Sequence, residues 1–416
     1  MKKSDANRIL TSHAGSLPRP ADLIELNRAR GAGEPVDANM LAARLSAAVA
    51  DVVRKQKELG IDVPDDGEFG KATTQAYDYG AWQSYIFERL SGFSPASEAK
   101  GASLRAPAGF GFALGRFRDR RDWQAFGDFY RDPSGSAFGS GKVAATRGGG
   151  IGGGRRPVCT GPIAYTGHQA LATDIANMKA AMQAAGVERG FMCAIAPGSC
   201  ARTEDAFYKS DAEYVYAVAE ALREEYQAIV NAGLTLQLDD PGLPDSWDMA
   251  SPAPPLEVYK KFARLRIEAM NHALRGLPAA QIRYHICWGS WHGPHTTDIP
   301  LRDIADLVLA VNAGEYSIEA GNVRHQHEWK VWQEVKLPAG KALVPGVVSH
   351  ATNVIEDPEV VADRIVHYAG VAGGENVIAG TDCGLGGRVH PQIAWAKLNA
   401  LVRGAELATR RLWGRA

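Results

Sequence analysis

The chain has 416 residues, of which 45% are hydrophobic and 22% charged, and its formal net charge is -1. These values are typical of a water-soluble globular protein with one large domain or two of ordinary size. Acidic and basic residues are spread along the whole length, so we expect neither nucleic acid nor an anionic membrane as a partner. The polar N-terminus, the lack of a long apolar run and the five cysteines predict a cytoplasmic protein that uses cysteine as a ligand.

Runs rich in β-branched residues alternate with helical patterns along most of the chain, which favours a parallel α/β architecture. Apolar residues recur at helical spacing over 40–59, 211–232 and 357–369, and each of these patterns ends before a glycine. Eight β–α repeats predict a single (β/α)8 (TIM) barrel over residues 1–416, with active-site groups at the carboxyl ends of its strands. The eight predicted strands lie at about 8–16, 61–68, 190–198, 234–240, 282–288, 315–320, 343–349 and 376–383.

Residues 91–156 break this alternation. They contain a stretch rich in Phe and Arg at 110–129 and a glycine run at 148–154. We interpret the segment as an insertion between the second and third strands that covers the barrel mouth as a lid or forms a contact in a homo-oligomer. The glycine run lacks the Gly-Lys-Ser/Thr ending of a phosphate-binding loop, so we expect a flexible loop there.

Four residues with metal-binding chemistry fall at the ends of predicted strands five, six and eight. His285 and Cys287 are separated by one residue, so on a strand both side chains point to the same face. A His-x-Cys pair by itself is a weak signal, because a buried histidine beside a buried cysteine is common. Together with Glu319 and Cys383, however, the pair offers one imidazole, two thiolates and one carboxylate, which suits tetrahedral Zn²⁺. We therefore predict a zinc site at the barrel mouth, and small buried roles for the other cysteines.

Several short motifs occur in an order and spacing similar to those of the cobalamin-independent methionine synthases and their shorter relatives. The resemblance covers most of the chain outside 91–156, and its motifs are specific jointly rather than singly. They are Ala-Gly-Ser-Leu-Pro at 14–18, Asp-Gly-Glu at 66–68, Gln-Leu-Asp-Asp-Pro at 237–241, His-Ile-Cys at 285–287, Ser-Ile-Glu at 317–319, Pro-Gly-Val-Val at 345–348 and Asp-Cys-Gly-Leu at 382–385.

This resemblance implies a zinc-dependent methyltransferase that acts on the thiol of homocysteine or a similar thiol. The family's zinc ligands match His285, Cys287, Glu319 and Cys383, and its zinc binds the homocysteine sulfur. A thiol with a pKa near ~8.5 is mostly protonated at neutral pH, and coordination to zinc converts it to the nucleophilic thiolate.

The resemblance also implies residues that bind the amino acid. Ser16 matches the serine that contacts the carboxylate, and Glu68 and Asp239 match the carboxylates that hold the amino group. The alternative for both acidic residues is a salt bridge at a strand end. His350 stands one residue away from the position of the family's proposed acid, and hydrogen bonding to a loop is an equal alternative for it.

The methyl-donor half of the site departs from the family. The motif at 196–202 lacks the tryptophan on which the family stacks its folate, and Asp240 stands where glutamate is usual. The donor stays open among a methylfolate, a corrinoid protein, a methoxylated compound and an epoxide. Trp288, Trp291 or Trp329 would then supply a replacement aromatic surface.

Three further readings compete with the methyltransferase. One is an epoxide-opening thiol transferase that resembles epoxyalkane:coenzyme M transferase, whose acceptor carries a sulfonate. Another is a metal-free barrel similar to uroporphyrinogen decarboxylase, against which the histidine and two cysteines argue. The last is a barrel in which zinc is only structural, although structural zinc normally stabilises small folds.

Overall fold

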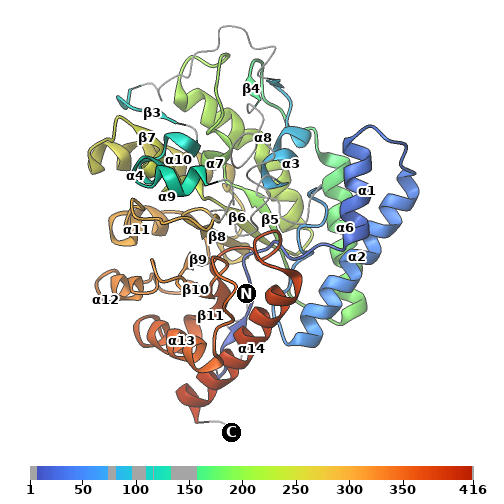
Figure 1. Cartoon of the computed structure of the whole chain (residues 1–416), viewed down its shortest axis with the longest axis vertical. Coiled ribbons are helices and arrows are strands. Elements are labelled where there is room, and N and C mark those ends of the chain that lie inside the picture. Colours follow the sequence, from blue (N-terminus) through green and yellow to red (C-terminus); the bar gives the residue numbers. More distant parts are fainter. Residues whose placement is uncertain (1–6, 74–80, 96–108, 116, 133–156, 415–416) are drawn as a thin grey trace.

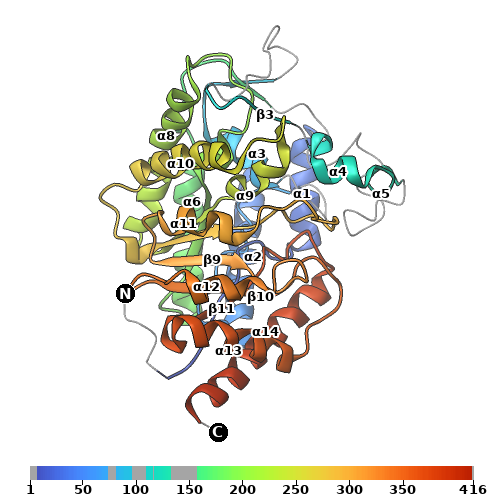
Figure 2. The ribbon, with the colours of Figure 1, turned by 90° about the vertical axis from the view of Figure 1, so that its left-hand side faces the viewer.

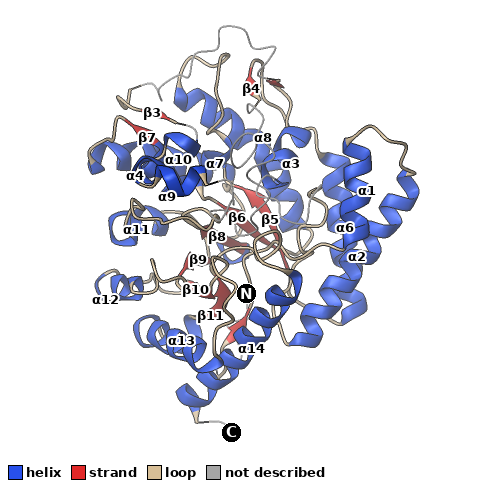
Figure 3. Ribbon diagram, in the orientation of Figure 1, coloured by secondary structure: helices blue, strands red, loops and turns tan. Residues whose placement is uncertain are grey.

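The computed structural model describes residues 7–73, 81–95, 109–115, 117–132 and 157–414. At its centre a seven-stranded parallel sheet curls into a barrel, and helices surround it (Figures 1 and 3). The order of the strands is β1-β11-β10-β9-β8-β6-β5, and the predicted (β/α)8 fold is confirmed. These strands are β1 (Leu10–Thr11), β5 (Phe191–Ile195), β6 (Thr235–Asp239), β8 (Ile282–Ile286), β9 (Glu315–Glu319), β10 (Ala342–Val348) and β11 (Ile378–Thr381).

The eighth position in the barrel wall, between β1 and β5, is filled by residues 61–68 without a regular strand. The Val63 amide donates to the Thr11 carbonyl at 3.1 Å, and the Phe191 amide donates to the Pro64 carbonyl at 3.0 Å. The prediction of a strand here is wrong for a local reason. The Asp65 carboxylate accepts from the amide of Gly67 at 2.8 Å, and such turns compete with a ladder of backbone hydrogen bonds.

The connections between barrel strands are helical, as predicted. Gly60 ends α2 at a φ of 99°, a conformation that glycine adopts without strain. Helix α13 continues three residues beyond the predicted end at 369, because its C-cap, with a positive φ of 86°, is Gly373 rather than Gly370. The helices are α1 (Ala21–Gly31), α2 (Ala38–Leu59), α3 (Ala81–Arg89), α4 (Arg121–Ala125), α5 (Gly127–Arg131), α6 (His168–Ala185), α7 (Pro197–Cys200), α8 (Asp211–Asn231), α9 (Gly242–Met249), α10 (Leu256–Ala273), α11 (Leu301–Leu309), α12 (Val331–Glu334), α13 (Pro358–Ala372) and α14 (Pro391–Trp413).

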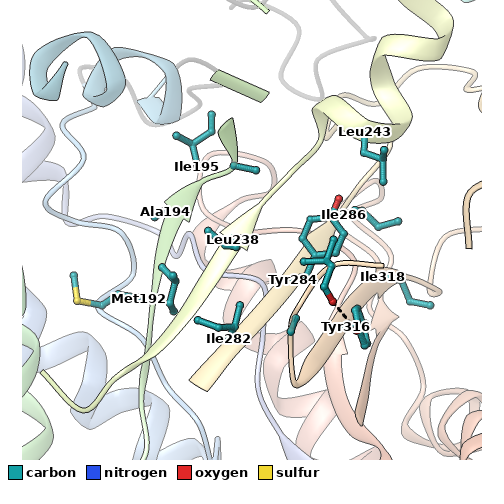
Figure 4. Close-up of a cluster of buried hydrophobic side chains, with 14 of the residues drawn as sticks. Met192, Ala194, Ile195, Leu238, Leu243, Ile282, Tyr284, Ile286, Tyr316 and Ile318 are labelled. Atoms are coloured by element: carbon teal, nitrogen blue, oxygen red, sulfur yellow. Dashed lines mark hydrogen bonds between the residues drawn. The ribbon is translucent and has the colours of Figure 1, made fainter. Parts of the chain in front are cut away.

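Alternation along the strands separates two environments. In β8 the side chains of Ile282, Tyr284 and Ile286 belong to the large apolar core between the sheet and the helices (Figure 4). The alternate residues Arg283 and His285 face the barrel interior, as the two-residue period of a strand requires. This alternation delivers polar side chains to the inside of the barrel, where they can form a site.

The lower part of the barrel interior is a buried polar layer. Arg283 donates to the Glu315 carboxylate at 2.8 Å and to the Ser12 hydroxyl at 2.9 Å. Both ends of the ion pair are almost fully buried, so removal of one partner would leave an uncompensated charge. The layer therefore joins β1, β8 and β9 beneath the barrel mouth.

Part of the 91–156 segment is described. Its residues pair with the rest of the chain through β2 (Phe93–Ser94) with β4 (Val158–Cys159), and β3 (Ala113–Leu114) with β7 (Ala250–Ser251). Figure 2 shows α4 and α5 at one edge of the molecule, beside the barrel. The predicted flexible glycine run at 148–154 lies outside the described residues. Among the helices that the structure does describe, none has the length and apolar character needed to cross a bilayer.

Candidate metal centre and substrate cavity

Three of the four predicted zinc ligands come together at the carboxyl ends of the barrel strands. His285 lies in β8, Cys287 follows its last residue, and Cys383 lies two residues beyond β11. Their ligand atoms all lie within 4.8 Å of one another, and the two sulfurs are 4.0 Å apart. Two thiolates on a tetrahedral zinc, with Zn–S bonds of about 2.3 Å, stand about 3.8 Å apart. The spacing therefore fits zinc.

The orientation of His285 fits a metal ligand as well. Its Nδ1 lies 3.0 Å from the Ser317 hydroxyl on the neighbouring strand β9. Its Nε2 is buried and has no hydrogen-bond partner among the described residues. A metal-binding histidine commonly has one ring nitrogen fixed by a hydrogen bond, which leaves the other for the metal.

The two cysteines are electrostatically unequal. A hydrogen bond from the neighbouring Cys287 thiol lowers the pKa of Cys383 well below its usual value. The same contact raises the pKa of Cys287 well above its usual value. The pair therefore already favours one thiolate, which is the form that binds a metal.

Glu319, the fourth predicted ligand, lies outside this three-residue group. Its carboxylate accepts hydrogen bonds from the Trp288 amide at 3.2 Å and the Asn322 side-chain amide at 2.8 Å. Burial raises its pKa well above its usual value. The residue ends β9 beside the cluster, and its ligand role stays a prediction.

Asp382 arranges the loop that follows Glu319, a role that sequence reasoning missed. Its carboxylate accepts from the backbone amides of Ala320, Gly321 and Asn322 at 2.7 to 2.8 Å. These contacts tie the end of β9 to the residue before Cys383. A signal was present in the Thr-Asp-Cys-Gly motif at 381–384, because an aspartate at a strand end is suited to capping loop amides.

One cavity contains the metal cluster and all three predicted substrate-binding residues: Ser16, Glu68 and Asp239. Glu68 has a φ of 60°, an uncommon conformation for a residue other than glycine that concentrates at functional sites. The lining is Ala14, Ser16, Arg19, Glu68, Lys71, Tyr85, Phe117, Arg120, Ile195, Arg202, Asp239, Pro241, Asp245, Met249, His285, Cys287, Gly289, Ser290, Trp291, Cys383, Gly384, Gly386 and Arg388.

Glu68 and Asp239 form what we call the acid corner of this cavity. One oxygen of each carboxylate and the Cys193 sulfur lie within 4.8 Å of one another. Burial raises the pKa of Asp239 to about 7. A Cβ added at Gly15 would lie 2.5 Å from Glu68 Oε1, so glycine at this position leaves room for the Glu68 carboxylate.

Lys71 also reaches the acid corner, and the sequence reasoning did not single it out. Its Nζ lies 3.1 Å from Glu68 Oε2, with both side chains buried. Burial opposes its charge, but the combined attraction of Glu68, Cys193 and Asp239 outweighs burial and raises the Lys71 pKa. The spacing of three residues between a glutamate and a lysine was the only signal for this pair.

Another part of the cavity wall, which we call the aromatic wall, combines aromatic side chains with buried ion pairs. Asp245 of α9 is paired with Arg120 and with Arg202, the latter at 2.6 Å. The Arg120 guanidinium stands 4.3 Å from the centroid of the Trp291 ring, and Phe117 meets the same ring edge-on at 5.1 Å. Thus residues of the 91–156 segment line the cavity.

Of the three tryptophans considered as a replacement aromatic surface, only Trp291 is in the cavity lining. Trp288 is buried against His325, with ring centroids 4.0 Å apart, and its indole nitrogen donates to the Ile299 carbonyl. Trp329 stacks on His367. Trp288 and Trp329 therefore act in packing, and the expectation of an aromatic cavity surface holds for Trp291 alone.

His350 follows β10 and does not line the cavity. It is buried, and neither ring nitrogen has a hydrogen-bond partner among the described residues. Burial lowers its pKa to about 3, so the ring is neutral at neutral pH. A neutral imidazole gives up its N–H proton far less readily than an imidazolium does, so His350 is a weak acid in this form.

Asp240, the departure from the family's glutamate, has a structural role. It accepts hydrogen bonds from the Ser199 hydroxyl at 2.6 Å and the Tyr284 hydroxyl at 2.8 Å. Ser199 belongs to the 196–202 motif, where the tryptophan is missing. These two departures thus meet in one buried network outside the cavity lining.

The chain is similar in sequence to known proteins. Methionine synthase from Thermococcus kodakarensis is 23% identical over 409 residues, which cover 97% of this chain and 94% of that protein. The 2-hydroxypropyl-CoM lyase of Xanthobacter autotrophicus is 26% identical over 237 residues, which cover 50% of this chain and 58% of that protein.

Solved structures support the fold, and a family model supports the membership. The structure of a B12-independent methionine synthase from Shewanella sp. W3-18-1 in complex with selenomethionine has a TM-score of 0.67 and 19% identity, covering 98% of this chain and 100% of that one. Residues 140–407 match the model of the cobalamin-independent synthase catalytic domain. The chain therefore belongs to the cobalamin-independent synthase family, a family of methyl and thiol transferases.

Proposed function

We propose that this protein is a zinc-dependent transferase that passes a methyl group to the thiol of homocysteine or a similar small thiol. The observation that carries the proposal is the cluster of His285, Cys287 and Cys383, with ligand atoms within 4.8 Å, in the wall of a cavity at the barrel mouth. One nitrogen and two sulfurs leave room for a substrate in a tetrahedral site.

His285, Cys287 and Cys383 would hold the zinc, with Glu319 as a fourth group beside them. Zinc bound there would supply Lewis acidity, which keeps a substrate thiol deprotonated and fixed in position. Ser317 orients the imidazole through Nδ1. Asp382 orders residues 320–322 behind Glu319. These contacts preorganise the ligands, so that little movement is needed when the metal and the thiol bind.

The remainder of the acceptor would lie along Ser16 and the acid corner. Ser16 is next to the metal cluster, because a Cβ added at Gly384 would lie 2.9 Å from the Ser16 Cβ. Its hydroxyl would bind the acceptor's carboxylate, as the resemblance implies. Sulfur at the metal and a carboxylate at Ser16 would hold a short thiol at two points, which favours a reactive orientation.

The alkyl donor would enter along the aromatic wall, over Trp291 and Phe117. Their apolar rings, with the Arg120 guanidinium 4.3 Å from Trp291, suit a flat or weakly polar group and exclude water from the reacting carbon. A methylfolate or a corrinoid-bound methyl group are both donors of the proposed type. The carbon would pass to the thiolate as its bond to the donor breaks. The leaving nitrogen of a methylfolate would take up a proton, whereas a corrinoid cobalt would keep the electron pair as Co(I).

Two observations favour a second candidate, the epoxide-opening thiol transferase. The cavity lining contains cationic side chains, including Lys71 and Arg388, which suit an acceptor with a sulfonate. Half of the chain also matches a 2-hydroxypropyl-CoM lyase. In this reaction a thiolate would attack an epoxide carbon, the C–O bond would break, and the alkoxide would take up a proton. A metal-free decarboxylase is disfavoured by the ligand cluster.

Zinc content and zinc-edge X-ray absorption test the proposal. Purified protein is expected to contain about one zinc per chain, whereas Cys383→Ser is expected to lose most of it. Added homocysteine or 2-mercaptoethanesulfonate should contribute a third sulfur to the zinc shell. Cys159→Ser is the matched control, because Cys159 is buried beside the Gly161 carbonyl and is not in the cluster. A metal-free wild-type protein, or a zinc shell that neither thiol changes, would overturn the proposal.

A thiol-by-donor activity screen then separates the two candidates. Methyl transfer from a methylfolate or a methyl-corrinoid protein supports the first candidate. Turnover of an epoxide with 2-mercaptoethanesulfonate supports the second. The Cys383→Ser protein is the blank for both reactions, since the proposed transfer requires the thiol to be held at the metal.

A further inference from the structure

Lys71 places a positive charge in the acid corner, where an amino acid ligand would otherwise place its ammonium group. Its Nζ lies 3.1 Å from Glu68 Oε2, and an oxygen of the same carboxylate group lies within 4.8 Å of an Asp239 oxygen. Two carboxylates that converge in a buried corner attract an ammonium group. Here the protein itself supplies that group.

The position of Lys71 is firmly held. The Lys71 amide donates to the Glu68 carbonyl at 3.0 Å, and Arg19 donates to the carbonyls of both residues at 2.5 and 3.0 Å. The Lys71 Nζ also stands 4.7 Å from the centroid of the Tyr85 ring. The side chain is only 8% exposed, so it lacks an easy path to solvent if another cation enters the corner.

The charge of the cavity as a whole points the same way. Its lining contains five cationic side chains, those of Arg19, Lys71, Arg120, Arg202 and Arg388, and three carboxylates, those of Glu68, Asp239 and Asp245. Asp245 is already paired with two of the arginines. A lining with more positive than negative side chains favours an anionic ligand over one that brings its own ammonium group.

We infer that Lys71 is a specificity-determining residue, whose ammonium group replaces the amino group of an amino acid beside Glu68. The site would then select a small anionic thiol that has a carboxylate or sulfonate but no amine. The inference rests on the proposed function for the thiol alone. It predicts that the resemblance to methionine synthases holds for the sulfur and fails for the amino group.

The physical basis is competition for the acid corner. A ligand ammonium at Glu68 would share one carboxylate with Lys71, and two like charges at hydrogen-bond distance from the same group repel each other. A ligand without the amine avoids this repulsion, and its anionic end gains from Lys71 and the nearby arginines. Since the corner is buried, solvent screens these charges weakly.

The test compares two thiols that differ only in the α-amino group, homocysteine and 4-mercaptobutanoate. Their dissociation constants are measured by calorimetry on the zinc-loaded full chain. Wild-type protein is expected to bind 4-mercaptobutanoate at least ten times more tightly. Lys71→Met should shift the ratio of the two constants at least tenfold toward homocysteine, because the acid corner then lacks its internal cation.

Two further variants complete the design. Lys71→Arg keeps the charge and should keep the preference for 4-mercaptobutanoate. Lys57→Met removes a lysine that is exposed on α2 and should leave the wild-type ratio unchanged. The wild-type ratio is a test in itself if Lys71→Met is too unstable to purify.

Several results would overturn the inference: tighter binding of homocysteine by the wild type, no binding of either thiol, or a ratio that Lys71→Met leaves unchanged. Zinc-edge X-ray absorption on the same samples reports separately whether sulfur reaches the metal. Failure of the zinc proposal would appear there as an unchanged zinc shell, whereas failure of the Lys71 inference appears in the ratio.

Discussion

The two walls of the cavity are built in different ways. The metal-cluster wall takes His285 from β8, and Cys287 and Cys383 from the residues just beyond β8 and β11. The places of these two strands are fixed by the barrel's backbone hydrogen bonds. The aromatic wall takes Phe117 and Arg120 from the 91–156 segment, and it is held by side-chain ion pairs to α9. The first wall is therefore suited to chemistry that needs fixed distances. The residues of the second wall can differ between proteins that use different donors, while the barrel itself stays the same.

The largest expected effect of a single change in the aromatic wall is at Asp245. Asp245→Asn would leave the Arg120 and Arg202 guanidinium groups buried without their shared carboxylate, so the free energy of unfolding should fall by about 3–5 kcal/mol. Urea denaturation measures it, and zinc content should stay at the wild-type value. Asp128→Asn is the control, because Asp128 is fully exposed where it pairs with Arg131. A loss below ~1 kcal/mol would mean that the two walls do not differ in this way.

A smaller effect is expected beneath the metal-cluster wall, at His13. Its Nε2 lies 2.7 Å from Gln56 Oε1, and burial lowers its pKa from 6.5 to about 4. The unfolded chain takes up this proton below its own pKa of about 6.5, while the folded chain resists it down to about 4. Stability should therefore be complete above pH 6.5 and fall by about 3 kcal/mol as the pH drops to 4.

Urea denaturation of wild type and His13→Asn across this pH range checks the assignment. The variant is expected to lose about 3 kcal/mol less between the two pH values, because it has no imidazole to protonate. His168→Asn should keep the wild-type pH dependence, since His168 is 63% exposed. An identical pH dependence in wild type and His13→Asn would refute the prediction.

The smallest of these effects concerns the support behind Glu319. Asp382→Asn removes the charge that holds the amides of residues 320–322, so zinc affinity should fall about 10- to 100-fold while the three cluster ligands remain. Chelator competition measures the affinity. Asp363→Asn is the control. Asp363 lies on α13 and forms an exposed ion pair with Arg411, so this change should leave the zinc affinity unaltered. Unchanged affinity in Asp382→Asn would show that the cluster does not depend on this loop.

Much of the fold was predictable because its signals are local. The alternation in Ile282–Ile286 and the glycine that ends α2 each report on a few neighbouring residues, and both predictions agree with the structure. The strand at 61–68 was predicted wrongly because Asp65 turns the backbone through its own side chain. Such competition between side chain and backbone is hard to recognise in an apolar run.

The candidate site was predictable only where motifs carried it. His285, Cys287 and Cys383 are recognisable by residue type and by their place at strand ends. The roles of Lys71 and Asp382 depend on how the chain packs around them. Their sequence signals, a Glu–Lys spacing of three residues and an aspartate at a strand end, are too common to identify such roles. The same reason separates Trp291, which reaches the cavity, from Trp288, which stacks on His325.

The irregular wall segment at 61–68 has a mechanical consequence. Only a few hydrogen bonds join it to β1 and β5, so the barrel wall is weakly paired along this side. Glu68 is the last residue of the weakly paired segment. Segments with sparse backbone pairing open at a lower free energy than the rest of a domain. A thiol that contacts both the metal cluster and the Glu68–Lys71 turn would connect this weakly paired segment to the rest of the barrel. Ligand binding should therefore slow hydrogen exchange at the amides of Asp62 and Val63 more than at the amides of the regular barrel strands.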